Sequence, residues 1–203
     1  MPRPRSLTPQ QLAAAAVAVL DREGVAALSM RAVAAELGMS TMGLYRYVAD
    51  RDELERLVVD LVLEDLDLEV PADRPWDARV AELALRAREA VLRHPAAIPL
   101  LLGHRQESVH SLRWGEAILA VLADAGFEPT ERVVAFRTLL SYIFGALLVQ
   151  DNAALDGAGT KVLADLPTAQ FPHLAATARA ARGLGAHEEF RAGLDVLLRG
   201  LRR

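Results

Sequence analysis

One segment near the N-terminus constrains the fold more than any other part of the chain, because it holds two short helix signals separated by a glycine. Ser29 is a good N-cap for the first helix, and Gly38 supplies the left-handed residue that commonly ends a helix. Ser40 can cap the second helix, in which Leu44 and Val48 lie four residues apart and point inward. These signals predict two short helices joined by a tight turn, the arrangement of a helix-turn-helix.

A further helix is expected on each side of this segment. Upstream, Thr8 and Gln11 are spaced as a capping box with a proline between them, and Gly24 is placed to end the helix. The apolar stripe of this helix can close a small three-helix core with the two short helices. Downstream, Asp50 and Glu53 form a second capping-box pattern, at the start of a helix that can run out of the N-terminal unit.

The second short helix carries an outward set of polar and aromatic residues suited to DNA, and in a helix-turn-helix this helix enters the major groove. Arg46 and Thr41 are candidates for base edges, since arginine paired with guanine is the commonest specific contact. Met42 could contact a thymine methyl, and Gly43 could let the backbone come close to the DNA. The candidates for phosphate contacts are Tyr45, Tyr47 and Arg51.

The net charge of −4 does not argue against nucleic acid, because the charges are unevenly distributed along the chain. Acidic residues accumulate between Glu64 and Glu69, where they could keep the rest of the protein away from phosphates. We call the N-terminal helices that would contact DNA the reading head. Arginines gather in or near it, at Arg3, Arg5, Arg31, Arg46 and Arg51. The competing interpretation is that these arginines are merely solvated. It is less favoured because the capping and turn signals of a helix-turn-helix surround them.

Composition excludes several other classes of protein. The 203 residues contain no cysteine, which excludes disulfides, thiolate catalysis and thiolate metal sites. No glycine-rich phosphate loop, nucleophile elbow or paired-histidine zinc motif is present, so we expect no enzyme activity and no cofactor. The Glu-x-x-His step from Glu107 to His110 lacks the second such step that a carboxylate metal bundle needs, so no metal is expected. Without a signal-peptide pattern or a long uncharged apolar run, we expect a cytoplasmic protein with no membrane partner.

Helix signals continue to the C-terminus after a linker with two prolines that ends at Pro75. We expect a DNA-binding domain over 1–50, a connecting helix over 51–70 and a second domain over 71–203. The stretch from Asp151 to Thr160 is predicted to be a mobile loop because it combines Asp, Asn, Gly and small residues. The later helices are expected near residues 76 to 93, 96 to 103, 107 to 125, 129 to 151, 173 to 182 and 187 to 202.

Two of these later helices are too apolar for one face to be exposed to solvent. They start near Pro129 and His187, and each carries leucines and phenylalanines on more than one side. Such a helix is either central in its own domain or shared with a partner chain. Gly145 and Gly193 would permit close approach, although each could equally be a tolerated helix glycine.

In order along the chain, these motifs resemble those of the tetracycline-repressor (TetR) family of bacterial transcription regulators. Weaker similarity to the tetracycline-repressor-type C-terminal domain covers short segments after residue 100. The resemblance implies an all-α fold, with an N-terminal three-helix helix-turn-helix domain and a larger C-terminal helical domain for ligand binding and dimerisation. It also implies that Arg31 reaches a base or phosphate. The motifs that carry it are Leu28-Ser29-Met30-Arg31, Leu37-Gly38-Met39-Ser40, Leu44-Tyr45-Arg46-Tyr47-Val48 and Asp50-Arg51-Asp52-Glu53-Leu54.

Family resemblance further implies a small-molecule pocket in the C-terminal domain. Candidates were chosen where polar groups and aromatics alternate with aliphatics on helices expected to face each other, and simple core packing is the competing interpretation. Because Leu101 stands where tetracycline-binding relatives have a metal-coordinating histidine, recognition of a metal–tetracycline chelate is not expected. The candidate lining residues are Leu101, Leu102, His104, His110, Trp114, Phe136, Leu140, Phe144 and Gln150.

The sequence therefore predicts a homodimeric transcriptional regulator that binds double-stranded DNA and responds to a small-molecule effector. Repression, with release from a palindromic operator by an inducer, is the usual mode of the family. The resemblance implies that the two most apolar helices pair with their copies as a four-helix interface. The alternative is a helical adaptor that has kept the fold and lost DNA binding.

Overall fold

The fold was obtained as a computed structural model, which describes residues 7–152, 155 and 157–202. These residues form helices, turns and loops and contain no strand, which confirms the all-α prediction. The chain divides into two compact units. One comprises the chain up to Val70 together with Arg86–Val121, and the other comprises Pro71–Leu85 and the chain from Leu122 onward.

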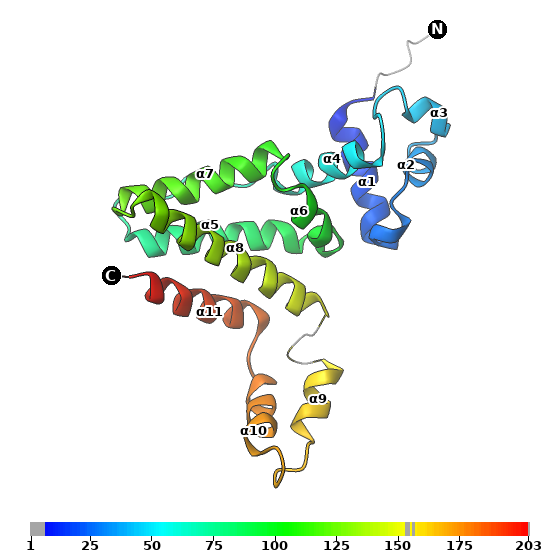
Figure 1. Ribbon diagram of the computed structural model, residues 1–203. Helices are drawn as coiled ribbons and strands as arrows, with labels where there is room; N and C mark the ends of the chain where they lie inside the picture. The colour runs from blue at the N-terminus through cyan, green and yellow to red at the C-terminus, as the bar shows by residue number, and fades with distance from the viewer. Residues whose placement is uncertain (1–6, 153–154, 156, 203) are drawn as a thin grey trace. The chain divides into compact units, whose positions relative to one another are not determined.

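The first unit begins with the reading head, and its caps follow the sequence closely. Thr8 and Gln11 form the expected capping box: the Gln11 N–H donates to Thr8 Oγ1 at 3.2 Å, and the Thr8 N–H donates to Gln11 Oε1 at 3.0 Å. Ser29 caps the next α-helix, and Gly38 has the left-handed φ of 66° that ends it. The elements of the head are α1 (Pro9–Glu23), η1 (Val25–Ala27), α2 (Met30–Glu36), α3 (Thr41–Leu44) and α4 (Arg51–Leu63), shown in Figure 1.

Two local details differ from the sequence prediction. The recognition helix α3 ends at Leu44, and residues 45–47 form turns, because the N–H groups of both Tyr47 and Val48 donate to the Leu44 carbonyl. The capping box of α4 is displaced by one residue. Asp50 accepts from the Glu53 N–H at 2.8 Å as expected, but Glu53 reaches back to the Ala49 N–H at 2.7 Å.

The core of the head lies between α1, α2 and α4. The apolar stripe expected on α1 is buried, and α1 packs against both α2 and α4. Leu44 and Val48 point into this core as predicted, although α3 is short. Burial of these side chains fixes the orientation of the recognition helix. The buried side chains of the head include Leu12, Ala16, Val19, Leu20, Val33, Ala34, Leu44, Val48, Leu54 and Val58.

The rest of the first unit packs on α4. After α5 (Trp76–Leu92) come η2 (Pro95–Ala97), α6 (Ile98–His104) and α7 (Val109–Asp124). The apolar face of α6, with Ile98, Leu100 and Leu101, is buried, and α6 packs against α4. This contact connects the helix that leaves the reading head with the segment from Arg86 onward.

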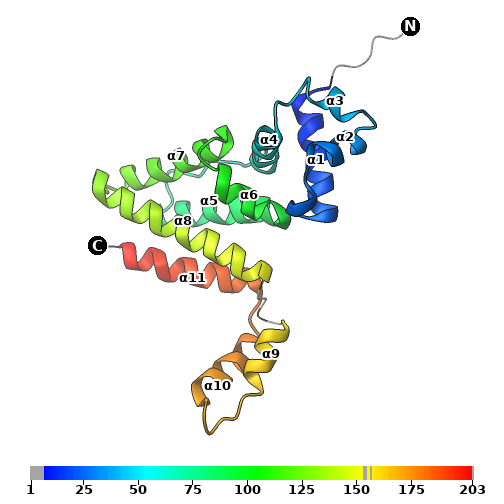
Figure 2. The same cartoon turned by 45° about the vertical axis from the view of Figure 1, so that its right-hand side comes forward.

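The second unit contains α8 (Pro129–Asn152), α9 (Ala158–Ala164), α10 (Pro172–Ala181) and α11 (Ala186–Leu201). The helices α8 and α11 lie side by side, as do α9 and α10 (Figures 1 and 2). Between α8 and α11 the Tyr142 hydroxyl donates to the Phe190 carbonyl at 2.6 Å, and the two rings pack with centroids 5.3 Å apart.

The loop predicted from Asp151 to Thr160 is wrong at both ends. Residues 151 and 152 belong to α8, α9 begins at Ala158, and residues 153, 154 and 156 lie outside the described residues. Extended backbone at Gly157 starts α9, and packing against α10 buries Ala164 and Ala175. Packing against the next helix in the chain therefore overrides the polar local composition that suggested a loop.

Candidate nucleic-acid interface

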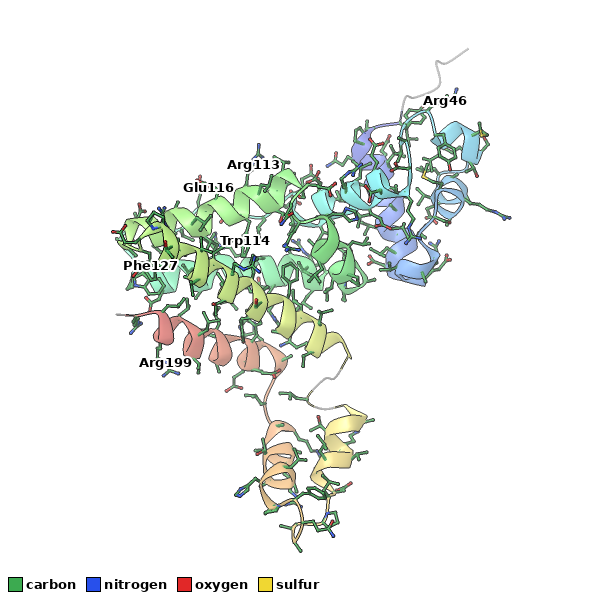
Figure 3. The ribbon with its side chains drawn as sticks, in the orientation of Figure 1. Arg46, Arg113, Trp114, Glu116, Phe127 and Arg199 are labelled. Carbon is green, nitrogen blue, oxygen red and sulfur yellow. The ribbon has the colours of Figure 1, made fainter. Side chains whose placement is uncertain are left out.

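The recognition helix α3 presents most of its large side chains to solvent. The Gly43 N–H donates to Ser40 Oγ at 3.1 Å, which caps the helix as the sequence predicts. With Leu44 anchored inside, Met42 is 76% exposed and Tyr45 is 48% exposed. Tyr47 and Arg46 are also exposed, and Figure 3 shows Arg46 at the outer edge of the head. A flexible thioether, two phenols and a guanidinium thus face outward from one short helix and the turn after it.

Gly43 has a packing reason to be glycine. It is buried, and a side-chain carbon added there would lie 3.1 Å from Met39 Cε and 3.2 Å from Ser40 Oγ. Its carbonyl accepts from Arg46 Nε at 3.5 Å, so the guanidinium lies near its own helix. Close approach of the Gly43 backbone to DNA stays a prediction.

The other three side chains predicted to contact DNA, Arg31, Thr41 and Arg51, have different surroundings. Arg31 is exposed on α2, and Thr41 is half-buried at the start of α3. Arg51 links α4 to η1. Its Nε donates to Glu55 of α4 at 2.6 Å, and its Nη2 donates to the Val25 carbonyl of η1 at 3.3 Å. A phosphate contact by Arg51 would have to compete with these two bonds or add to them.

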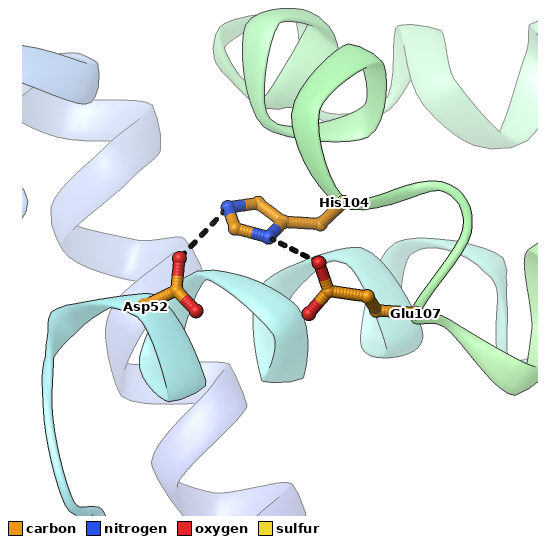
Figure 4. Close-up of side chains that lie close together, drawn as sticks. All are labelled: Asp52, His104 and Glu107. Carbon is orange, nitrogen blue, oxygen red and sulfur yellow. Dashed lines mark ion pairs between the residues drawn. The ribbon is translucent and has the colours of Figure 1, made fainter.

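A charged cluster between α4 and α6 could not be seen in the sequence. His104, at the end of α6, places Nε2 3.0 Å from Glu55 and 3.8 Å from Asp52, and Nδ1 4.0 Å from Glu107. Arg56 bridges two of these carboxylates, with Nη1 2.5 Å from Asp52 and 2.9 Å from Glu107. Figure 4 shows the imidazole between Asp52 and Glu107. The hydrogen bond that Arg56 donates to Glu107 raises the pKa of Arg56 above its ordinary value.

This cluster is an ion-pair network rather than a cation site. Ligand-type atoms of Asp52, His104 and Glu107 lie within 4.8 Å of one another. The Arg56 guanidinium, however, already bonds both carboxylates and supplies the positive charge that they need. The carboxylates also face different nitrogens of the ring, whereas a metal would draw them to one.

The predicted ligand-lining residues are divided between the two units. In the first unit, Leu101 and Trp114 are buried, Leu102 is exposed, and His104 and His110 face acidic residues of α4. Those in the second unit all lie on α8. Phe136, Leu140 and Phe144 are half-buried, while Gln150 donates to the Ala186 carbonyl at 2.9 Å.

Two of these residues line cavities within their own unit. His110 borders a groove of about 370 Å³, which it shares with side chains of α1 and α4, including Asp60, and with Glu64 just after α4. Gln150 borders a cavity of about 320 Å³ between α8 and α11, together with Tyr142 and Phe190. The assignment of the nine residues to one effector pocket stays a prediction.

A capped helix-turn-helix with an outward helix rich in arginine and aromatic side chains defines a helical DNA-binding protein of the helix-turn-helix class. Residues 12–56 match the family model for bacterial regulatory proteins of the tetR family, and residues 70–203 match that for the tetracyclin repressor-like C-terminal domain. The chain belongs to the TetR family of transcription regulators, as its motifs indicate.

Individual relatives support the same family. An HTH-type transcriptional regulator of Saccharopolyspora erythraea is 30% identical over 156 residues, which are 76% of this chain and 66% of that protein. The HTH-type transcriptional repressor DrrR1 of Streptomyces coeruleorubidus is 34% identical over 148 residues, which are 71% of this chain and 54% of DrrR1. The chain thus spans between half and two thirds of these relatives. A crystal structure of the Streptomyces coelicolor TetR family protein ActR in complex with (S)-DNPA superimposes with a TM-score of 0.82 at 27% identity, covering 96% of each chain.

Proposed function

We propose that the chain is a homodimeric repressor that binds a palindromic operator and is released from it by a small-molecule inducer. The observation that carries this proposal is the recognition helix, in which buried Leu44 and Val48 fix an outward face with Met42, Tyr45 and Arg46. These side chains can make base, methyl and phosphate contacts in a major groove. An adaptor without DNA binding would have no need for this exposed apolar and aromatic set.

The apolar helix α8 supports dimerisation. Its window from Pro129 to Gln150 has a mean hydropathy of 1.7, yet only 22% of it is buried in the single chain. By length and composition this helix could also cross a membrane, but apolar helices in regulators of this family are expected to pair with a second copy. Val133, Val134 and Val149 of α8 and Val196 of α11 are each more than half exposed, and a second copy would cover them. We propose a cytoplasmic dimer.

A small organic effector is proposed for the C-terminal domain, and no catalytic role is proposed. ActR, similar over nearly the whole chain, is described in complex with (S)-DNPA, which supports a pocket for small organic molecules in this fold. Leu101 occupies the position before Leu102 and Gly103 at which the sequence lacks a metal-binding histidine, so the proposal does not include a metal–tetracycline chelate.

Selection of binding sites from a random DNA pool tests the proposal. The purified chain is incubated with the pool at moderate salt and with excess nonspecific competitor, and bound DNA is sequenced over several rounds. Enrichment of a palindrome is expected, because a two-fold dimer presents two identical heads. No enrichment by a folded, dimeric protein would contradict the proposal and favour the adaptor. The matched control is Arg46→Ala, which is expected to keep the fold and the dimer and to lose the preference for one base in each half-site.

A further inference from the structure

The groove that His110 borders lies wholly within the first unit, and side chains of α1, α4 and α7 line it. Its volume of about 370 Å³ falls in the range of about 300 to 1,000 Å³ that is usual for sites of small organic molecules. Ala13, Leu57 and Leu61 supply an apolar part of its lining. The groove can therefore hold the carbon body of a small ligand.

The groove carries negative charge that no basic side chain offsets. Asp60 and Glu64 line it, and no lysine or arginine does. Within the described part of the chain, the one ion-pair partner of Asp60 is His110, and no lysine or arginine lies within ion-pair distance of either carboxylate. Carboxylates in a concave site with apolar walls concentrate the field and attract a cation. The ligand that complements this groove is therefore positively charged.

Both carboxylates are held in place by neutral donors. The Ser108 hydroxyl, which is fully buried, donates to Asp60 Oδ1 at 2.5 Å. Gln10 Nε2 donates to the two oxygens of Glu64 at 3.2 and 3.1 Å. A carboxylate has roughly four lone-pair sites, so each of the two can accept further hydrogen bonds. Asp60 and Glu64 are thus oriented by their neighbours and keep their charge.

The Nδ1 atom of His110 adds an incomplete hydrogen bond at the same place. This nitrogen is buried, and among the described residues it has no hydrogen-bond partner. It lies 3.7 Å from Asp60 Oδ1, which is longer than a hydrogen bond. Buried polar atoms without a partner are uncommon in folded proteins. The missing partner lies beside the carboxylate that lines the groove.

We propose that this groove binds a small organic cation, a primary ammonium group on an apolar body. Asp60 and Glu64 lie four residues apart on one face of the α4 helix and its cap, so a single ammonium can donate to both. Its third N–H can donate to His110 Nδ1 when the ring turns toward the groove. The carbon body lies against Ala13, Leu57 and Leu61. Binding requires neither DNA nor a second copy of the chain, so the site does not rest on the proposed function.

Calorimetric titration of the full chain with 2-phenylethylamine at pH 7 and low ionic strength tests the site. Saturable binding is expected, and the neutral analogue 2-phenylethanol should bind at least about tenfold more weakly. The variant D60N/E64Q keeps the size of both side chains and removes their charge, so the amine should bind about 10- to 100-fold more weakly. The matched control is D65N/E69Q, which removes two exposed carboxylates of the same acidic stretch outside the groove and should keep the affinity of the wild type.

Three results would overturn the site: no saturable binding of the amine to the wild type, unchanged affinity in D60N/E64Q, or an equal loss in both double variants. If D60N/E64Q does not fold, E64Q replaces it, since this side chain is exposed, and weaker amine binding is again expected. The imidazole resonances of His110, assigned by their loss in H110Q, should also shift when the amine is added to the wild type, and unshifted resonances would contradict the site. Amine binding by a protein that selects no operator supports the site and contradicts the proposed function alone.

Discussion

Substitution of Gly193 by alanine is expected to disrupt the packing of α11 on α8, although alanine is the better helix former. A side-chain carbon added at Gly193 would collide with the Tyr142 hydroxyl oxygen and lie 3.0 Å from two carbons of its ring. The tyrosine is held between the helices by its hydrogen bond to the Phe190 carbonyl and by the Phe190 ring. The ring must therefore move, and the hydrogen bond must lengthen or break.

The magnitude follows from three opposing contributions. Overpacking a well-filled site costs about 1 to 3 kcal/mol, and losing the tyrosine hydrogen bond costs about 1 kcal/mol. Replacing glycine with alanine inside a helix stabilises the helix by about 1 kcal/mol. The expected net loss in the free energy of unfolding for Gly193→Ala is therefore about 1 to 3 kcal/mol.

Equilibrium unfolding in urea at one fixed protein concentration measures this loss, because the proposed dimerisation would make the apparent stability depend on concentration. Gly200→Ala on the same helix is the matched control, since its added carbon meets nothing within 4 Å, and it should lose no stability. Tyr142→Phe removes the oxygen that collides, so the double variant should be more stable than the sum of the two single losses predicts, by at least about 0.5 kcal/mol. Strict additivity, or an unchanged Gly193→Ala protein, would refute the packing argument.

Further predictions concern the head and the second unit. Arg46→Ala should cost about 1 to 3 kcal/mol of operator binding at one base position, whereas Arg51→Ala should weaken all sequences alike and flatten the salt dependence; equal behaviour in binding assays would contradict this assignment. Ser40→Ala removes the cap of α3 and should lower unfolding stability by about 0.5 to 2 kcal/mol in urea titrations. Arg202 lowers the pKa of Asp77 chiefly through a hydrogen bond, so this carboxylate contributes stability above its ordinary pKa of 3.8 and loses that contribution as pH falls through the lowered value. Arg202→Gln should therefore destabilise the protein at pH 7 and much less at pH 2, and an equal loss at both pH values would refute the linkage.

The capped ends of the helices could be predicted from the sequence because each depends on residues three or four positions apart. Thr8 with Gln11, and Ser29 and Ser40 alone, act within a single turn of chain. The helix α9 could not be predicted in this way, because its stability depends on α10 rather than on its own polar start. In the proposed site, the outward face of α3 follows from Leu44 and Val48, whose inward spacing is local.

The charged cluster could not be predicted because its members are distant in sequence. His104 meets Glu55 across 49 positions, and Arg56 meets Glu107 across 51 positions. In the sequence, His104 was a candidate pocket residue, and that interpretation depended on its own neighbours. The length of α3 was misjudged for the opposite reason, since the apolar spacing of Leu44 and Val48 persists through a turn that is no longer helical.

The division of α5 between the two units has a consequence for chimeric regulators. Trp76–Leu85 belongs to one unit and Arg86–Leu92 to the other, so the border falls within a continuous helix. Consider a hybrid in which another regulator supplies the segment up to the position of Val70 and this chain supplies the rest. The α4 helix of the other regulator would then pack on the α6 helix of this chain, and His104 would lose its partner unless that regulator also has a carboxylate at the position of Glu55. Exchange of operator specificity between relatives is therefore easier by grafting α3 and its flanking turns than by swapping the whole N-terminal segment.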